Sequence, residues 1–275
     1  MRVSRLALLA LLSSPAFAAL PAYAAAPLAP HRAVYDLVLD KASDRSGITG
    51  IAGRMVYEFN GSPCEGYTVK FRFVTQIDTG ENSRVTDQQT TTFEDAEGKT
   101  FSFVTKSFVD QTLDREVKGM ATRENNGLKV EIDKPEKNSL ELPPTQFPTQ
   151  HLVELIGKAN SGETFYETNL FDGSEDADKV MTTTVIVGKK SEAEKSDPEL
   201  PALKDLAAQK YWPIDIAYFD ENTDGGEEVP EYRIAFKLHE NGLTRDLVMD
   251  YGDFSMTGKL VNLALFPAPK EKCDQ

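Results

Sequence analysis

The stretches "TVKFRFVTQI" (68–77) and "VTDQQTTTF" (85–93) decide the fold class, because apolar and polar residues alternate along the first and the second is rich in Thr between Val85 and Phe93. Alternation with a period of two, together with many Thr, Val and Phe residues, is typical of half-buried β-strands. The same pattern continues outward through most of the chain. Further stretches of this kind are 32–40, 53–59, 100–109, 116–123, 128–132, 165–171, 180–187, 213–219, 232–239, 243–249 and 254–266.

Turn signals separate these stretches. Asn126-Gly127, Asp172-Gly173 and Asn241-Gly242 lie between neighbouring stretches, and such pairs favour hairpin turns. About 13 or 14 strands with short connections would make a flat sheet too wide to stay open. We therefore expect an all-β, mainly antiparallel fold: a single large curled or spiral, incompletely closed β-barrel.

One or two short helices are expected beside the sheet. In "PPTQFPTQHLVELIGKANSG" (143–162), Pro148 marks a helix start, Thr149 is the expected cap, and an apolar stripe follows. This helix is expected to plug the open end or the concave face of the sheet. The segment 197–209 is a weaker candidate for a second helix, and the polar stretch 189–199 predicts a long solvated loop.

The segment "MRVSRLALLALLSSPAFAALPAYA" (1–24) predicts a cleaved secretory signal peptide, with basic residues, a short apolar run and the small-residue site Ala22-Tyr23-Ala24. The apolar run is too short for a membrane span, and prolines interrupt it. We expect residues 25–275 to form a single exported domain in the periplasm, with no membrane-spanning segment.

The chain is strongly acidic. It has 30 basic and 44 acidic residues and a formal net charge of −14. Loss of the leader with its two arginines makes the charge about −16. Such a charge repels nucleic acid and anionic membrane surfaces, so nucleic-acid binding is excluded.

The chain has two cysteines, Cys64 and Cys273. In an exported protein such a pair tends to form a disulfide, and only one intramolecular pairing exists. The bond would close about 210 residues of chain, which the chain-entropy model values at roughly 5 kcal/mol at most. A catalytic dithiol would need a closer spacing, and an intermolecular bond from the tail remains the alternative.

One acidic stretch, "DENTDGGEEVPE" (220–231), matches a calcium-loop pattern. Asp220, Asn222, Asp224 and Glu231 fall at positions 1, 3, 5 and 12 of an EF-hand loop. The flanking residues alternate like strands rather than helices, and Pro230 breaks the pattern. We therefore interpret the stretch as a hairpin connection and expect no metal.

Catalytic motifs are missing from the sequence. His31, His151 and His239 are scattered, and no zinc motif, nucleophile elbow or phosphate-binding loop occurs. We expect no catalytic residue, no cofactor and no enzymatic activity. A hydrolase of envelope polymers, with a triad assembled from distant strands around His151 or His239, is the least favoured alternative.

Aromatic residues interleave the strands. Core packing is the simpler interpretation, and an apolar cavity that accepts an acyl chain or a peptide is the functional one. These residues are Phe71, Phe73, Phe101, Phe103, Tyr166, Tyr218, Phe219 and Phe236.

The whole chain resembles the cell-envelope integrity protein B family of alphaproteobacteria. The resemblance rests on "LAPHRAVYDLVL" (28–39), "GRMVYEF" (53–59), "CEGYTVKFRF" (64–73), "LPPTQFPTQHLVELI" (142–156), "YWPIDIAYF" (211–219) and "NGLTRDLVMDYGDF" (241–254). It implies a periplasmic monomer with a broken, spiral-like β-barrel and a disulfide at the positions of Cys64 and Cys273. It also implies a role in envelope maintenance under stress and a functional link to a periplasmic tetratricopeptide-repeat protein.

We therefore expect a non-enzymatic periplasmic protein that supports envelope integrity and stress resistance. A groove or a sheet edge would bind a protein, peptide or lipid partner. The alternative is a periplasmic carrier of lipid or lipoprotein that uses an apolar cavity.

Overall fold

The structure is a computed structural model that describes residues 28–220 and 229–267. The first eight strands are β1 (His31–Ala42), β2 (Gly50–Ser62), β3 (Gly66–Thr79), β4 (Asn82–Glu94), β5 (Thr100–Val109), β6 (Thr112–Glu124), β7 (Gly127–Lys134) and β8 (Asn138–Leu142). The others are β9 (Phe165–Leu170), β10 (Met181–Val187), β11 (Tyr211–Asp220), β12 (Tyr232–His239), β13 (Thr244–Asp250) and β14 (Phe254–Leu265). The helices are α1 (Pro148–Ser161), α2 (Leu200–Leu203) and the short 3-10 turns η1 (Asp44–Ser46) and η2 (Lys204–Ala208).

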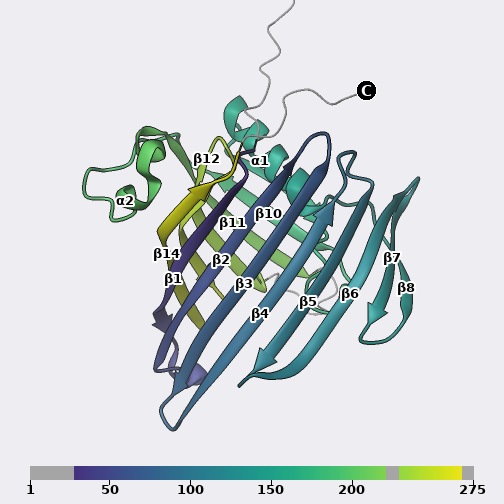
Figure 1. Cartoon of the computed structure of the whole chain (residues 1–275), viewed down its shortest axis with the longest axis horizontal. Helices are drawn as coiled ribbons and strands as arrows, with labels where there is room; N and C mark the ends of the chain where they lie inside the picture. The colour runs from purple at the N-terminus through teal and green to yellow at the C-terminus, as the bar shows by residue number, and fades with distance from the viewer. Residues whose placement is uncertain (1–27, 221–228, 268–275) are drawn as a thin grey trace, which may run out of the picture.

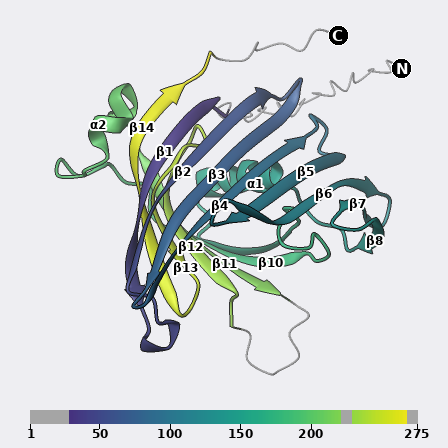
Figure 2. The same cartoon turned by 60° about the horizontal axis from the view of Figure 1, so that its bottom comes forward.

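All these strands belong to one 14-stranded sheet with the order β8-β7-β6-β5-β4-β3-β2-β1-β14-β13-β12-β11-β10-β9. The chain enters the sheet in its middle at β1, runs outward to β8, crosses through α1 to β9 and returns to β14 beside β1 (Figure 1). Figure 2 shows the sheet curling so that β10–β13 face β2–β5. The edge strands β8 and β9 are not paired with each other. The predicted incompletely closed, mainly antiparallel barrel is thus confirmed.

The three predicted turn pairs differ in their connections. Asn126-Gly127 joins β6 to β7 and Asn241-Gly242 joins β12 to β13 by short turns. Gly242 has a φ of 85°, a conformation that glycine adopts without steric cost. Asp172-Gly173 instead begins the longer connection 171–180 between β9 and β10.

Helix α1 lies against the concave side of the sheet (Figure 2). The prediction that Thr149 caps the helix is wrong. The N-cap residue is Phe147, which makes no side-chain capping bond. The Glu94 carboxylate caps the helix instead: it accepts the N–H groups of Thr149 at 2.8 Å and Gln150 at 3.2 Å. A carboxylate there satisfies free backbone donors and opposes the helix dipole. Glu94 ends β4, so this bond ties α1 to the opposite wall.

The apolar core is divided into three clusters. One surrounds α1 and β9–β12, one follows β1, β2, β13 and β14, and one lies among β5–β7 and Phe147. None of the three includes a residue of β4. The β4 residues that share the concave face are Thr86, Gln88, Thr90 and Thr92. Because these side chains are polar, the clusters do not merge in front of β4.

The connection 188–210 carries α2 and lies outside the barrel (Figure 1). The prediction of a solvated loop over 189–199 is wrong at its end, because Glu199 is only 1% exposed. Glu199 and Asp197 both accept hydrogen bonds from Arg245 Nη1 at 2.8 Å. Arg245 is fully buried and its Nε donates to His239 Nε2 at 3.0 Å. Buried charges therefore fasten this connection to β12 and β13.

Candidate functional site

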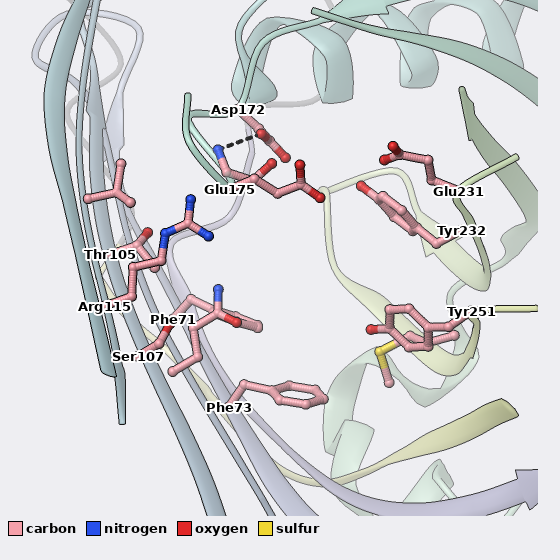
Figure 3. A pocket seen from close by; sticks show the side chains of 14 residues that line it. Phe71, Phe73, Thr105, Ser107, Arg115, Asp172, Glu175, Glu231, Tyr232 and Tyr251 are labelled. Atoms are coloured by element: carbon pink, nitrogen blue, oxygen red, sulfur yellow. Dashed lines mark hydrogen bonds between the residues drawn. The ribbon is translucent and has the colours of Figure 1, made fainter. Parts of the chain in front are cut away.

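The candidate site is a cavity of about 590 Å³ on the concave side of the sheet (Figure 3). It lies where β4 contributes no apolar side chain. Two walls and a roof bound it: one wall from β3–β6, one from β12 and β13, and a roof from the β9–β10 connection. Its volume is in the range of ligand-binding pockets.

The first wall consists of two cross-strand rows. Directly paired residues of antiparallel strands project from the same face of a sheet. The first row runs Phe71–Thr90–Thr105–Val117, and the second runs Phe73–Gln88–Ser107–Arg115. The Thr90 and Thr105 hydroxyl groups are 3.0 Å apart and bond to each other. Each row therefore begins with an aromatic ring and continues with two polar groups; the first row ends with the apolar Val117 and the second with the basic Arg115.

The second wall is aromatic. Tyr232 stacks on Tyr218 with ring centroids 4.2 Å apart, and Tyr251 stacks on Phe254 at 5.0 Å. Met249 of β13 also lines the cavity. Burial raises the pKa of both Tyr232 and Tyr251. Both phenols therefore stay protonated and neutral at physiological pH.

The roof is rich in carboxylates. Asp172 and Glu175 line the cavity from above, and Glu231 reaches it from just before β12 (Figure 3). Ser174 of the β9–β10 connection also lines it. Lys179 binds Glu175 at 3.0 Å and Glu231 at 2.9 Å. Burial acts to lower the pKa of Lys179, but its carboxylate partners raise it overall. Lys179 is thus a permanent cation that holds the roof to the second wall.

Arg115 is the basic residue that faces the cavity from the first wall (Figure 3). Its guanidinium forms an ion pair with Asp176 of the β9–β10 connection. Ion pairs therefore link the β9–β10 connection to both walls, through Arg115 on one side and through Lys179 and Glu231 on the other. Its lining, within the part of the chain that the structure describes, contains no histidine and no cysteine.

The sequence-predicted site residues lie elsewhere. Cys64 is in the turn between β2 and β3, where its N–H donates to Ser62 Oγ at 3.3 Å. Cys273 lies outside the described residues, so the disulfide stays a prediction. His31, His151 and His239 lie on β1, α1 and β12. Among residues 28–220 and 229–267, no cluster of three potential metal ligands is present.

The calcium-loop pattern is only partly described. Asn222 and Asp224 lie outside the described residues. Asp220 and Glu231 both bind Lys179 at 2.9 Å. The carboxylates at the two ends of the pattern thus bind the ammonium group of Lys179, and this contact stabilises the connection between β11 and β12. It gives no support to a calcium site.

Most of the cavity residues could not be predicted from the sequence. Of the aromatic residues singled out, Phe71 and Phe73 line it, whereas Phe101, Phe103 and Tyr166 pack in the clusters. Arg115, Tyr232 and Tyr251 carried no signal of their own, and Asp172 carried only a turn signal. One signal was available: "VTDQQTTTF" lies among alternating strands, but its inward positions carry Thr and Gln instead of apolar side chains. A strand that is polar on its concave face indicates a hydrated interior.

No helix in the described ranges is long and apolar enough to cross a membrane.

Comparisons with known proteins place the chain in a family. The model of the family described as EipB-like matches residues 22–267. The chain is 57% identical over 254 residues to the cell envelope integrity protein EipB of Brucella abortus (strain 2308), covering 91% of this chain and 89% of that protein. A crystal structure of a beta-barrel-like protein of domain of unknown function DUF1849 from Brucella abortus has 56% identity and a TM-score of 0.84, over 88% of this chain and all of that one. The resemblance seen in the sequence is therefore confirmed, and the chain belongs to the EipB-like family.

Proposed function

We propose that this protein maintains cell-envelope integrity from the periplasm, and that it acts by binding a partner in the cavity between β3–β6 and β12–β13. The name of the Brucella relative, a cell envelope integrity protein, supports the role. The single observation that carries the binding step is the cavity itself. It is large, open to the concave side and lined by both aromatic and hydrogen-bonding groups.

The proposal includes the export of the chain. The leader 1–24, which lies outside the described residues, would direct residues 25–275 to the periplasm as one domain. There a Cys64–Cys273 disulfide would tie the tail to the β2–β3 turn. The resemblance names a periplasmic tetratricopeptide-repeat protein as a candidate partner.

A binding role fits the chemistry of the lining better than catalysis does. Arg115, Glu175 and Glu231 are held in ion pairs. Tyr232 and Tyr251 are neutral at physiological pH, because the pKa of each lies above the ordinary value of a phenol. Such groups recognise and orient a ligand, but they offer no base poised near neutral pH.

A cavity-blocking variant tests this proposal. Thr105→Trp places an indole in the cavity, whereas Lys106→Trp, the matched control, adds the same ring on the opposite face of β5. We expect the Lys106 variant to restore detergent and β-lactam resistance to a strain that lacks the gene. The Thr105 variant should restore it at least fourfold less well at equal protein level, as judged by immunoblot. Full complementation by Thr105→Trp would contradict the use of the cavity.

A lipid or lipoprotein carrier is the second candidate. The apolar members of the lining, Phe71, Phe73, Val117 and Met249, favour it. Native mass spectrometry of protein purified from its own host is the test. A bound lipid that Thr105→Trp removes would support the carrier, and protein that is always free of lipid would count against it.

A further inference from the structure

The electrostatic character of the cavity roof distinguishes between classes of ligand. Five carboxylates gather there with two basic groups, Arg115 and Lys179. Asp172, Glu175 and Glu231 line the cavity, and Asp176 and Asp220 lie beside it in ion pairs with Arg115 and Lys179. A single ammonium group, Lys179, is shared by three of them. The roof therefore carries a net negative charge.

Asp172 is the carboxylate that remains without a basic partner in the described parts of the chain. Its Oδ1 accepts the N–H of Ser174 at 2.8 Å, which orients the carboxylate. Figure 3 shows Asp172 at the top of the cavity, across from Tyr232. Its charge contributes to the raised pKa of Tyr232, after burial and the neighbouring Tyr218. A cation in the cavity would lie within reach of this carboxylate and of the Tyr232 hydroxyl.

The walls below the roof combine apolar and polar groups. Phe71, Phe73 and Tyr251 offer aromatic surface, and Tyr251 remains 41% exposed. Gln88 and Ser107 stand next to one another in a row of the first wall. An acyl chain laid against them would bury their polar groups without a partner, which is unfavourable. The backbone of a peptide offers them both donors and acceptors.

We propose that the occupant of the cavity is a peptide segment in which basic and apolar side chains alternate. This inference rests on the proposed function and names the class of ligand. The basic side chain binds Asp172 and the roof, the apolar side chains pack on Phe71, Phe73 and Tyr251, and the peptide backbone bonds to Gln88 and Ser107. An acidic segment or an anionic lipid meets the negative roof and is repelled.

Binding of two hexapeptides tests the charge preference. Fluorescein-labelled peptides of alternating lysine and phenylalanine, or glutamate and phenylalanine, are titrated with protein purified from cells that express the full-length gene. We expect fluorescence anisotropy to show binding of the lysine peptide at least tenfold tighter than that of the glutamate peptide. The affinity should fall as NaCl is raised, because exposed charges are screened. Equal affinity for the two peptides would overturn the inference.

Matched charge variants locate the binding. Asp172→Asn keeps an oxygen for the Ser174 N–H but removes the charge. Asp36→Asn removes the same charge from the outer face, where Asp36 pairs with Arg54. We expect Asp172→Asn to weaken binding of the lysine peptide about three- to fivefold and Asp36→Asn to leave it within twofold. Equal effects of both variants would overturn the inference.

The two proposals fail in different ways. If Thr105→Trp abolishes complementation but the lysine peptide does not bind, the cavity is functional and the ligand class is wrong. Displacement of a fluorescent fatty acid, with no binding of either peptide, would assign the cavity to a lipid. If Thr105→Trp complements fully, the proposed function itself is wrong.

Discussion

Replacing the fully buried Arg245 by methionine should destabilise the protein far more than the same change at an exposed arginine. Arg245 has no solvent exposure, and the Asp197 and Glu199 side chains that it binds are 5% and 2% exposed. The substitution leaves the buried Glu199 without its arginine partner, and it leaves Asp197 with Lys237 alone. Breaking a buried ion pair in this way costs about 3–5 kcal/mol.

The shift in melting temperature follows from the size of the chain. In a protein of this length, about 1 kcal/mol corresponds to a shift of about 2–4 °C. Arg245→Met should therefore lower the melting temperature by about 6–20 °C. Burial acts to raise the pKa of Asp197, but the Glu199 N–H and the Arg245 and Lys237 side chains together lower it to about 2. Both carboxylate partners of Arg245 are thus held close to cationic or N–H donors.

A matched variant controls for the loss of one arginine. Arg54 pairs with Asp36 on the outer face, where the two side chains are 61% and 47% exposed. Arg54→Met should cost no more than about 1 kcal/mol. Both variants are melted under far-ultraviolet circular dichroism at 0.15 M NaCl, with urea unfolding as a second measurement.

A difference of less than 2 °C between the two variants would refute this reasoning. A second substitution keeps the test informative if Arg245→Met folds poorly. Glu199→Gln in the Arg245→Met background removes one orphaned charge and retains an oxygen for the Asp246 and Leu260 N–H groups. It should recover part of the lost stability.

Two further predictions concern the pH dependence of stability and the predicted disulfide. Burial and the Arg245 charge lower the pKa of His239 to about 4, so the unfolded chain binds more protons between pH 6.5 and 4. Stability should fall by up to about 3 kcal/mol as the pH drops through that range, and His239→Asn should flatten this slope in urea unfolding. Cys64→Ser should lower the melting temperature by several degrees, because the open chain gains entropy. No shift after this change or after adding reductant would contradict the predicted disulfide with Cys273.

The strands could be predicted because their cause is local. Alternation in "TVKFRFVTQI" forces one face of the segment toward water and one away from it, whatever the neighbours are. The Asn126-Gly127 and Asn241-Gly242 turns have equally local causes. A large number of such strands then implies a curled sheet, and the structure has one.

The cavity could not be predicted in the same way. Thr105 is an ordinary strand residue until the register sets it between Thr90 and Val117 and the curl of the sheet places it in one cavity with Tyr232 and Tyr251. The polar inner face of β4 was visible in the sequence, but its meaning depends on the apolar clusters that form on either side of it.

The partners of the buried charges also depend on the tertiary structure. Glu94 caps a helix that begins more than 50 residues later in the chain, and Glu199 binds an arginine 46 residues away. Nothing in the local sequence distinguishes these two glutamates from the many exposed ones.

Sequence alone determined the class of this protein. The alternation of residues predicted the strands, the number of strands predicted a curled sheet, and the segments that carry the family resemblance indicated the family. Only the tertiary structure decided where the sheet stays open, which face of β4 looks inward and which carboxylates meet a cation. The physical reason is the separation along the chain over which each kind of interaction acts. Strand and turn preferences act over a few neighbouring residues, whereas a cavity and a buried ion pair arise from side chains that only the folded chain brings together.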